Sequence, residues 1–321
     1  MEMSLPCGQI SLNENTWSHP LNNSVIKTII FTSLALIPLA ANSVLCRLAL
    51  GREAIDAVGF TSIRLLAGIL TLLVIIKIKG EKTYSAENGS WLAGLMLFIY
   101  AITFSFAYIS LDTGTGALIL FGAVQITMIV LSLFAGNRLH LVEWLGMSVA
   151  FAGFVYLILP GVSTPSISGF ALMTIAGIAW GIYTLKGQGS KDPLLDTANN
   201  FIRTLPLVAV LIILSLGSIH YTTEGILLAA ISGGLASGIG YTLWYTALRG
   251  LSATQAAVIQ LLVPVIAALG GVMFVSEHIS IRLALSGVTV LGGILMVVLG
   301  RYCFVRRPIR RNLEQNSTGT R

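Results

Sequence analysis

The sequence has little charge. Aspartate, glutamate, lysine and arginine make up only 10% of its 321 residues, whereas 55% are hydrophobic. Soluble globular domains carry about 25% charged residues, so this chain lacks the polar surface that water on all sides requires. Its apolar runs approach the roughly 20 residues that a helix needs to cross a bilayer. They do not alternate apolar and polar residues as barrel strands do, and lipid requires internally bonded backbone. The composition predicts an all-α membrane protein.

Motifs for metal, disulfide or nucleotide chemistry are also missing. The three cysteines, Cys7, Cys46 and Cys303, form neither a disulfide framework nor a CxxC pair. The four histidines share no ligand spacing, and HExxH and GxSxG are absent. A membrane-embedded enzyme acting on lipids is therefore poorly supported, and we expect neither enzyme activity nor a cofactor or metal. Without a GxxxxGK[ST] motif, ATP cannot drive the protein directly unless a partner supplies it.

Ten apolar segments are present, separated by short connections that contain nearly all the charge. We predict spans at Thr28–Cys46, Ala57–Ile76, Trp91–Leu111, Thr115–Ala135, Val142–Leu159, Ile167–Leu185, Ala198–Leu216, Gly225–Leu248, Ala253–Val275 and Leu283–Gly300. A cleaved signal peptide is not expected, because no short apolar stretch with a small-residue cleavage site precedes the first span.

Lysine and arginine predict the orientation, because cytoplasmic loops retain them. With the N-terminus inside, only Arg47, Arg52 and Arg282 of the 19 basic residues fall outside. Two lie within spans, which leaves fourteen on the cytoplasmic side. Both termini, residues 1–27 and the basic tail 301–321, are then cytoplasmic. The tail is expected to lie against anionic lipid, and no nucleic-acid partner is expected because no DNA or RNA module accompanies it.

The two halves of the chain resemble each other. Ile-Arg64 and Ile-Arg203 coincide at an offset of 139, as do Arg47 and Lys186, and Tyr108 meets Tyr245 at an offset of 137. Similarity at a nearly fixed offset indicates duplication. We infer repeats at 28–159 and 167–300. Five spans per repeat is an odd number, so the halves must be inverted, as in many secondary transporters that bind substrate near the midplane.

These motifs resemble the EamA family of the drug/metabolite transporter superfamily over nearly the whole chain. The matching residues are Asn42, Arg47, Phe60-xxx-Arg64, Ala-Tyr108-xx-Leu, Gly-Asn137-Arg-Leu, Trp144-Leu-Gly146, Trp180-Gly181, Ile-Arg203, Trp244-Tyr245-xx-Leu248, Pro264, Ser-Glu277 and Gly287. The first half departs from the family pattern at two positions. Val124 stands where the second half has Pro264, and Asn137 stands where family members usually have an acidic residue, as the second half does at Glu277. The resemblance implies ten helices in a bacterial inner membrane and export of a metabolite such as an amino acid.

Two arginines inside spans are the first candidate site residues. A charge near the bilayer centre costs about 2.5–3.5 kcal/mol and is usually retained for a reason. Arg64 and Arg203 can bind a substrate carboxylate or phosphate through the planar guanidinium fork. Alternatively they form structural ion pairs with Asp56 and Asp196, which lie about two turns upstream. Both interpretations remain open.

Aromatic and polar residues supply the other candidates. Tyr100, Phe104 and Tyr108 recur every fourth residue, and Tyr241, Trp244 and Tyr245 share one face of another span, so the two stripes can line a common cavity. An interfacial belt is the alternative, especially for Tyr108 and Tyr245 near span ends. Asn42 and Trp180 occupy nearly the same position in the two repeats and are further candidates. Arg47, Lys186, Pro264 and Glu277 are candidates for gating or structural roles.

The function that follows is a secondary transporter that rocks one repeat against the other around a small-molecule site. Arginines in the core favour anionic or zwitterionic substrates over lipophilic cations. A broad-specificity drug exporter and a membrane receptor or scaffold that transports nothing are the alternatives.

Overall fold

A computed structural model describes residues 23–80, 88–134, 141–159, 165–188, 190–215, 220–251, 256 and 259–318 of the chain. Within these ranges the regular elements are helices, apart from an isolated bridge between Ile55 and Tyr221. The helices are α1 (Asn23–Gly51), α2 (Ala57–Lys79), α3 (Trp91–Tyr108), α4 (Thr113–Phe134), α5 (Leu141–Ile158), α6 (Ile167–Gly187), α7 (Pro193–Ile202), α8 (Leu205–Leu214), α9 (Thr223–Ile231), α10 (Gly240–Leu248), α12 (Leu262–Gly270) and α13 (Ile281–Thr318), with π-helical segments η1 (Ser232–Ile239) and η2 (Gly271–Val275).

Nine helical segments in the described part of the chain are long and apolar enough to cross a membrane, and each coincides with a predicted span. The remaining predicted span, Ala253–Val275, appears as the shorter apolar helix Leu262–Val275, and most of its first six residues lie outside the described residues. The all-helical membrane prediction is confirmed. Residues 1–22 of the predicted N-terminal segment 1–27 lie outside the described residues. Helix α1 begins at Asn23 and includes the rest of that segment.

The seventh span differs from its predicted bounds. It begins at Pro193 rather than Ala198, because the Asp192 side chain caps the helix by accepting a hydrogen bond from the Leu195 amide at 3.1 Å. It is interrupted at Arg203, which ends α7. Pro206 lies in the first turn of α8 and cannot donate to the preceding turn, which explains the interruption. The last helix is also longer than predicted, since α13 continues through the tail to Thr318.

The outer surface of the protein is more apolar than that of a soluble protein, and some polar side chains are buried within the largely apolar core. Large apolar residues such as Ile37, Leu70 and Val288 are 63–73% exposed on the outer faces of the helices, whereas Asn42 and Arg64 are 1% exposed in the interior. Apolar surface on this scale marks a face that contacts something other than water. The outer surface therefore suits lipid, and the polar groups gather inside.

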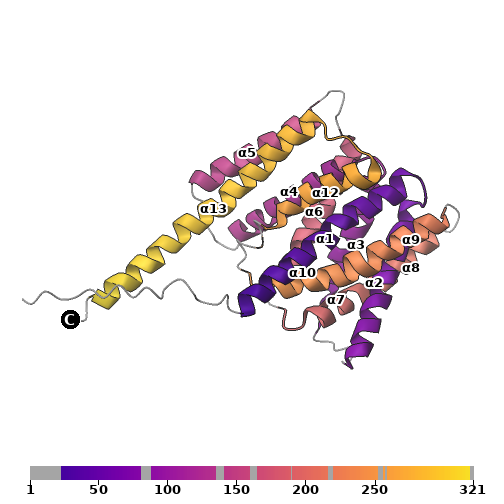
Figure 1. The fold of residues 1–321 in the computed structure, drawn as a ribbon, viewed down its shortest axis with the longest axis horizontal. Coiled ribbons are helices and arrows are strands. Elements are labelled where there is room, and N and C mark those ends of the chain that lie inside the picture. The colour runs from indigo at the N-terminus through magenta and orange to yellow at the C-terminus, as the bar shows by residue number, and fades with distance from the viewer. Residues whose placement is uncertain are drawn as a thin grey trace, which may run out of the picture.

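The helices of the two halves pack together rather than forming separate bundles. Helix α1 lies along α10 and α12, α3 lies along α6, and α2 packs on η1. Helix α4 packs on both α6 and α12. Figure 1 shows α5 and α13 as a pair beside this bundle, with α13 extending well beyond it. The polar interior lies where α1, α2, α3, α6 and the α9–α10 region meet.

Candidate functional site

The Arg64 guanidinium lies at the centre of this interior and contacts three helical segments. Its Nε donates to Ser237 Oγ at 3.1 Å, and Nη2 donates to the hydroxyls of Tyr100 at 3.1 Å and Tyr241 at 2.8 Å. The guanidinium carbon also lies 5.2 and 4.9 Å from the ring centroids of Tyr100 and Phe104, within cation–π range. All these partners are neutral.

The alternative in which Arg64 pairs with Asp56 is wrong. Asp56 caps α2 instead: one carboxylate oxygen accepts from the amides of Val58 and Gly59, both at 3.0 Å. The other oxygen accepts from the His220 amide at 3.0 Å. No carboxylate lies within ion-pair distance of Arg64 in the described part of the chain. A buried charge with neutral partners alone is costly, because burial removes the hydration of an ion. An anionic ligand would offset this cost.

Asn42 extends the hydrogen-bond network from α1. Its amide nitrogen donates to the Tyr241 hydroxyl at 3.4 Å, and its Oδ1 accepts from Ser232 at 2.7 Å and Ser237 at 3.3 Å. The Tyr241 hydroxyl in turn donates to that of Tyr100 at 3.3 Å. Asn42, predicted as a site residue, thus belongs to one network with Arg64. The two serines were not predicted.

The π-helical segment η1 explains why both serines reach Asn42. Ser232 and Ser237 are five residues apart, which an α-helix would separate by about 140°. In a π-helix hydrogen bonds join residues five apart, so these side chains share a face. The segment also approaches α2 closely: a Cβ atom at Gly233 would lie 2.0 Å from the Arg64 carbonyl oxygen. Glycine is therefore required for this helix contact.

Aromatic rings enclose the polar network. Trp180 from α6 lies 4.9 Å from Tyr100, 4.6 Å from Tyr241 and 5.3 Å from Tyr183 between ring centroids. The indole Nε1 of Trp180 and Nη1 of Arg64 are buried donors that lack a hydrogen-bond partner within the described residues. Buried donors are almost always paired in folded proteins. These two donors are among several buried polar side-chain atoms that lack a partner in the described part of the chain. We refer to Asn42, Arg64, Tyr100, Phe104, Trp180, Ser237 and Tyr241 as the Arg64 cluster.

The remaining aromatic candidates pack elsewhere. Tyr108 and Tyr245 are almost fully buried, so the belt interpretation is wrong for them. The Tyr108 hydroxyl donates to the Thr113 carbonyl at 3.3 Å, and that of Tyr245 donates to the Tyr183 carbonyl at 3.2 Å. Trp244 is also buried in α10, and its indole nitrogen lacks a hydrogen-bond partner in the described ranges.

Arg203 lies outside the Arg64 cluster. It donates to the Asn88 carbonyl at 2.8 Å and lies 6.0 Å from the Trp91 ring, both at the start of α3. The alternative ion pair with Asp196 is not formed in the part of the chain that the structure describes. Asp196 instead accepts from the Asn88 side-chain amide at 3.1 Å and the Gly89 amide at 2.9 Å. Both charged residues therefore hold the turn before α3, so Arg203 and Arg64 have different surroundings although both lie within predicted spans.

An ion pair joins the far end of α1 to the end of η2. Arg47 Nε donates to Glu277 at 3.2 Å, and the Glu277 carboxylate also accepts from the Thr113 amide at 2.9 and 3.1 Å. The Nη1 group of Arg47 donates to the carbonyls of Tyr108 and Ile109 at the end of α3. These bonds tie α1, α3, α4 and η2 together. We call this set of contacts the Arg47 latch.

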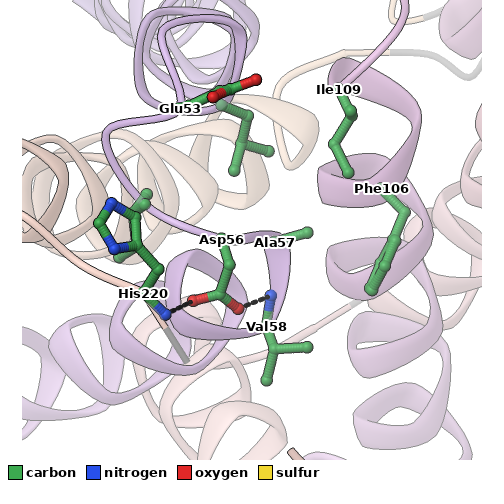
Figure 2. Close-up of a pocket in the computed structure, with 9 residues that line it drawn as sticks. Glu53, Asp56, Ala57, Val58, Phe106, Ile109 and His220 are labelled. Carbon is green, nitrogen blue, oxygen red and sulfur yellow. Dashed lines mark hydrogen bonds between the residues drawn. The ribbon is translucent and has the colours of Figure 1, made fainter. Parts of the chain in front are cut away.

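A pocket of about 380 Å³ borders the latch through Ile109. In Figure 2 the Asp56 carboxylate bridges the backbone amides of His220 and Val58 at its floor. Ala57 lines this pocket, and Arg64 lies seven residues after it in α2. The helix rises about 10 Å over these seven residues, so the pocket and the Arg64 cluster are separated by about that distance along α2. The pocket is lined by Leu50, Glu53, Ile55, Asp56, Ala57, Val58, Phe106, Ile109 and His220.

Lys186 and Pro264, two candidates for gating or structural roles, lie outside both the Arg64 cluster and the Arg47 latch. Lys186 is exposed near the end of α6, and no ion pair to it is found among the described residues. Pro264 lies in the first turn of α12, just after a turn at Leu261 that interrupts the helix although Leu261 keeps helical backbone angles. Proline cannot donate to the carbonyl four residues before it, here that of Gln260, which accounts for the interruption.

Known proteins resemble this chain over most of its length. The model of the EamA-like transporter family matches residues 167–299. An uncharacterized protein of Pseudomonas aeruginosa is 45% identical over 275 residues, 86% of this chain and 96% of the relative. The uncharacterized transporter YoaV of Bacillus subtilis is 21% identical, covering 78% of this chain and 89% of the relative.

Two further proteins are also similar. An uncharacterized transporter of Archaeoglobus fulgidus is 28% identical over 209 residues, 63% of this chain and 74% of the relative. One solved crystal structure superposes with a TM-score of 0.58 at 19% identity and covers 83% of this chain and 98% of its own. At that identity the match shows a shared fold.

Proposed function

Because the chain belongs to the EamA-like transporter family of membrane transporters, we propose that it is a secondary transporter that exports a small carboxylate-bearing metabolite such as an amino acid. The observation that carries this proposal is the Arg64 guanidinium, buried without a carboxylate partner in the described part of the chain and with Nη1 unpaired. A substrate carboxylate would accept hydrogen bonds from such a group in good geometry.

The Arg64 cluster also suits the ammonium group of an amino acid. The Arg64 guanidinium lies over the Tyr100 ring, and the Trp180 ring packs against Tyr100 at 4.9 Å between centroids. An ammonium group is attracted to the face of a tryptophan ring. A lipophilic cation would meet the positive charge of Arg64 without compensation, which disfavours the drug-efflux alternative. The side chains of the cluster are at most 4% exposed, so substrate entry requires the surrounding helices to part.

The helix contacts support ten spans arranged as two inverted repeats, 28–159 and 167–300. The repeat offset relates α1 to α6 and α3 to α10, so the contact of α1 with α10 has a counterpart in that of α3 with α6. In the same way the contact of α4 with α6 matches that of α12 with α1, and α5 pairs with its own counterpart α13. A two-fold axis in the membrane plane would produce these exchanged pairs. Both termini would face the cytoplasm of a bacterial inner membrane.

Alternating access would then involve the Arg47 latch. Arg47 and Glu277 are bound to each other on one side of the molecule, whereas the repeat counterpart of Arg47, Lys186, is exposed. This asymmetry fits a conformation that is closed on the Arg47 side, the outside in the proposed orientation. Opening would separate α1 from η2 and connect the adjacent pocket to the Arg64 cluster.

Glu277→Gln is expected to weaken the latch and expose Cys46, the neighbour of Arg47 in α1, which is fully buried. A hydrogen bond to a charged group contributes about 1.5–3 kcal/mol, so the outward-open population should rise about tenfold or more. The measurement is the labelling rate of Cys46 by a membrane-impermeant thiol reagent added outside, in protein whose Cys7 and Cys303 are replaced by serine.

Glu224→Gln is the matched control for this substitution. Glu224 pairs with Arg52 at 3.5 Å, but both side chains are more than half exposed, and such pairs contribute little. Its labelling rate should equal that of the parent. If Glu277→Gln leaves Cys46 as protected as Glu224→Gln does, the latch does not hold this side closed.

The direct test of the function is counterflow in proteoliposomes containing the purified protein. A panel of amino acids and small organic acids is expected to include a substrate that exchanges with its own radiolabelled form. If lipophilic cations exchange and no carboxylate does, the proposed substrate class is wrong.

A further inference from the structure

An apolar groove of about 520 Å³ runs between α4, α5 and α6 on the membrane face of the protein. Ile126 and Val130 of α4, Phe151 of α5, and Ile178 and Ile182 of α6 are among its walls. Phe151 is 65% exposed and Ile178 is 42% exposed, so the groove faces the surroundings of the protein rather than the Arg64 cluster.

The described residues that line the groove offer no free hydrogen-bond donor to a polar ligand. Among its described lining residues the polar side chains are Thr127 and Thr174, and both hydroxyls donate to carbonyls of their own helix, those of Ala123 at 2.7 Å and Phe170 at 2.8 Å. In a bilayer a void with such walls is filled by hydrocarbon, because packing against carbon recovers dispersion contacts that an empty groove lacks.

The helix arrangement explains why the groove exists. Helix α5 packs along α13 and has few contacts with α4, so it stands away from α6 (Figure 1). Phe154 of α5 closes one end: its ring lies 6.2 Å from that of Phe170, edge to face. Gly122 of α4 allows this, since a Cβ atom there would lie 2.2 Å from the Phe154 ring.

The opposite end of the groove leads toward a lysine. Phe170, Thr174, Ile178 and Ile182 line the groove at successive turns of α6. Lys186 follows one turn after Ile182 and is rotated from it by about 40° around the helix. Sixteen residues of helix span about 24 Å, close to the thickness of the hydrocarbon layer. Lys186 therefore lies about one turn beyond the last α6 residue that lines the groove, near the end of the helix, and it is exposed.

We propose that this groove binds one acyl chain of an anionic phospholipid whose phosphate is held by Lys186. The ammonium has no ion pair within the described residues, so it is available to a headgroup. Basic residues beside transmembrane grooves recognise anionic headgroups in this way, and a lysine can extend its aliphatic stem along apolar wall to reach them. The proposal concerns a bilayer lipid and does not depend on the transported substrate.

Native mass spectrometry of the purified full-length protein with phosphatidylglycerol and phosphatidylcholine tests the proposal. Ile178→Trp fills the groove and is expected to remove the bound-lipid species. Ile175→Trp is its matched control, because Ile175 is 44% exposed on the same helix but does not line the groove. Lys186→Gln should retain lipid but weaken phosphatidylglycerol binding about fivefold, the factor expected for one basic contact near an anionic surface. Lys191→Gln, an exposed lysine beyond α6, should leave this preference unchanged.

Three outcomes would overturn the proposal. Equal lipid binding by Ile178→Trp and Ile175→Trp would mean that lipid does not occupy the groove. Equal preference for phosphatidylglycerol in Lys186→Gln and in the parent would remove the lysine from the site. A parent dimer that becomes a monomer with Ile178→Trp would assign the groove to a second copy of the chain.

Discussion

Arg64→Gln is expected to reduce counterflow of the identified substrate about 10- to 100-fold at equal amounts of reconstituted protein. Hydrogen bonds to a charged group contribute about 1.5–3 kcal/mol, and each 1.4 kcal/mol corresponds to a factor of ten. The variant should fold, because the Tyr100 and Tyr241 hydroxyls remain bonded to each other and Asn42 still donates to Tyr241. Substrate-dependent shifts in thermal stability provide an independent measure of the lost binding.

Two further variants separate recognition from general effects of charge. Arg203→Gln removes the second of the two arginines that lie within predicted spans. The Arg203 side chain binds the turn at Asn88 and does not belong to the Arg64 cluster. It should lower stability and leave the apparent substrate affinity unchanged. Arg64→Lys keeps the charge without the planar fork and should give intermediate transport. If Arg64→Gln transports as well as Arg203→Gln, Arg64 is not the carboxylate anchor.

Gly233→Ala is expected to be the most destabilising small substitution in the helix bundle. The added methyl group would lie 2.0 Å from the Arg64 carbonyl oxygen and 2.8 Å from its carbonyl carbon, and backbone atoms cannot move aside as a flexible side chain can. Overpacking of a core costs about 1–3 kcal/mol, and here it would also push η1 away from α2. We expect a clear loss of thermal stability in detergent together with reduced transport.

Gly292→Ala in α13 is the control. A Cβ atom at this position meets nothing within 4 Å. Alanine also favours a helix over glycine by about 0.5–1 kcal/mol, so this variant should be neutral or slightly stabilised. If the apparent unfolding temperatures of the two variants agree, α2 and η1 do not pack as closely as described.

The sequence was sufficient to predict the membrane class, nine of the spans and most of the Arg64 cluster. Apolar length identifies a span without knowledge of packing. Asn42, Arg64, Tyr100, Trp180 and Tyr241 stand out because polar and aromatic groups are costly or conspicuous in apolar helices, and the structure brings these five together. The repeat helped by relating Asn42 to Trp180.

Other features depend on geometry that no local pattern specifies. Ser232 and Ser237 are five residues apart, a spacing that hides their common face if an α-helix is assumed. The glycine-rich sequence Ser-Gly-Gly-Leu-Ala-Ser-Gly was the available signal for this deviation. The proposed partners of the two arginines were wrong because helical spacing ignored competing backbone donors. Asp56 caps α2 and Asp196 binds the turn before α3.

The claim on which the account depends is that the Arg64 cluster opens to both sides of the membrane in turn. The most direct test is Ser237→Cys in a protein whose Cys7, Cys46 and Cys303 are replaced by alanine, labelled with an impermeant thiol reagent in right-side-out and inside-out vesicles. Ser286→Cys in α13 is the control, since Ser286 is also fully buried. The account predicts that the cysteine at position 237 is labelled from both sides and protected by substrate, whereas that at 286 is labelled from neither. Labelling of position 237 from one side only, in protein that still transports, would contradict it.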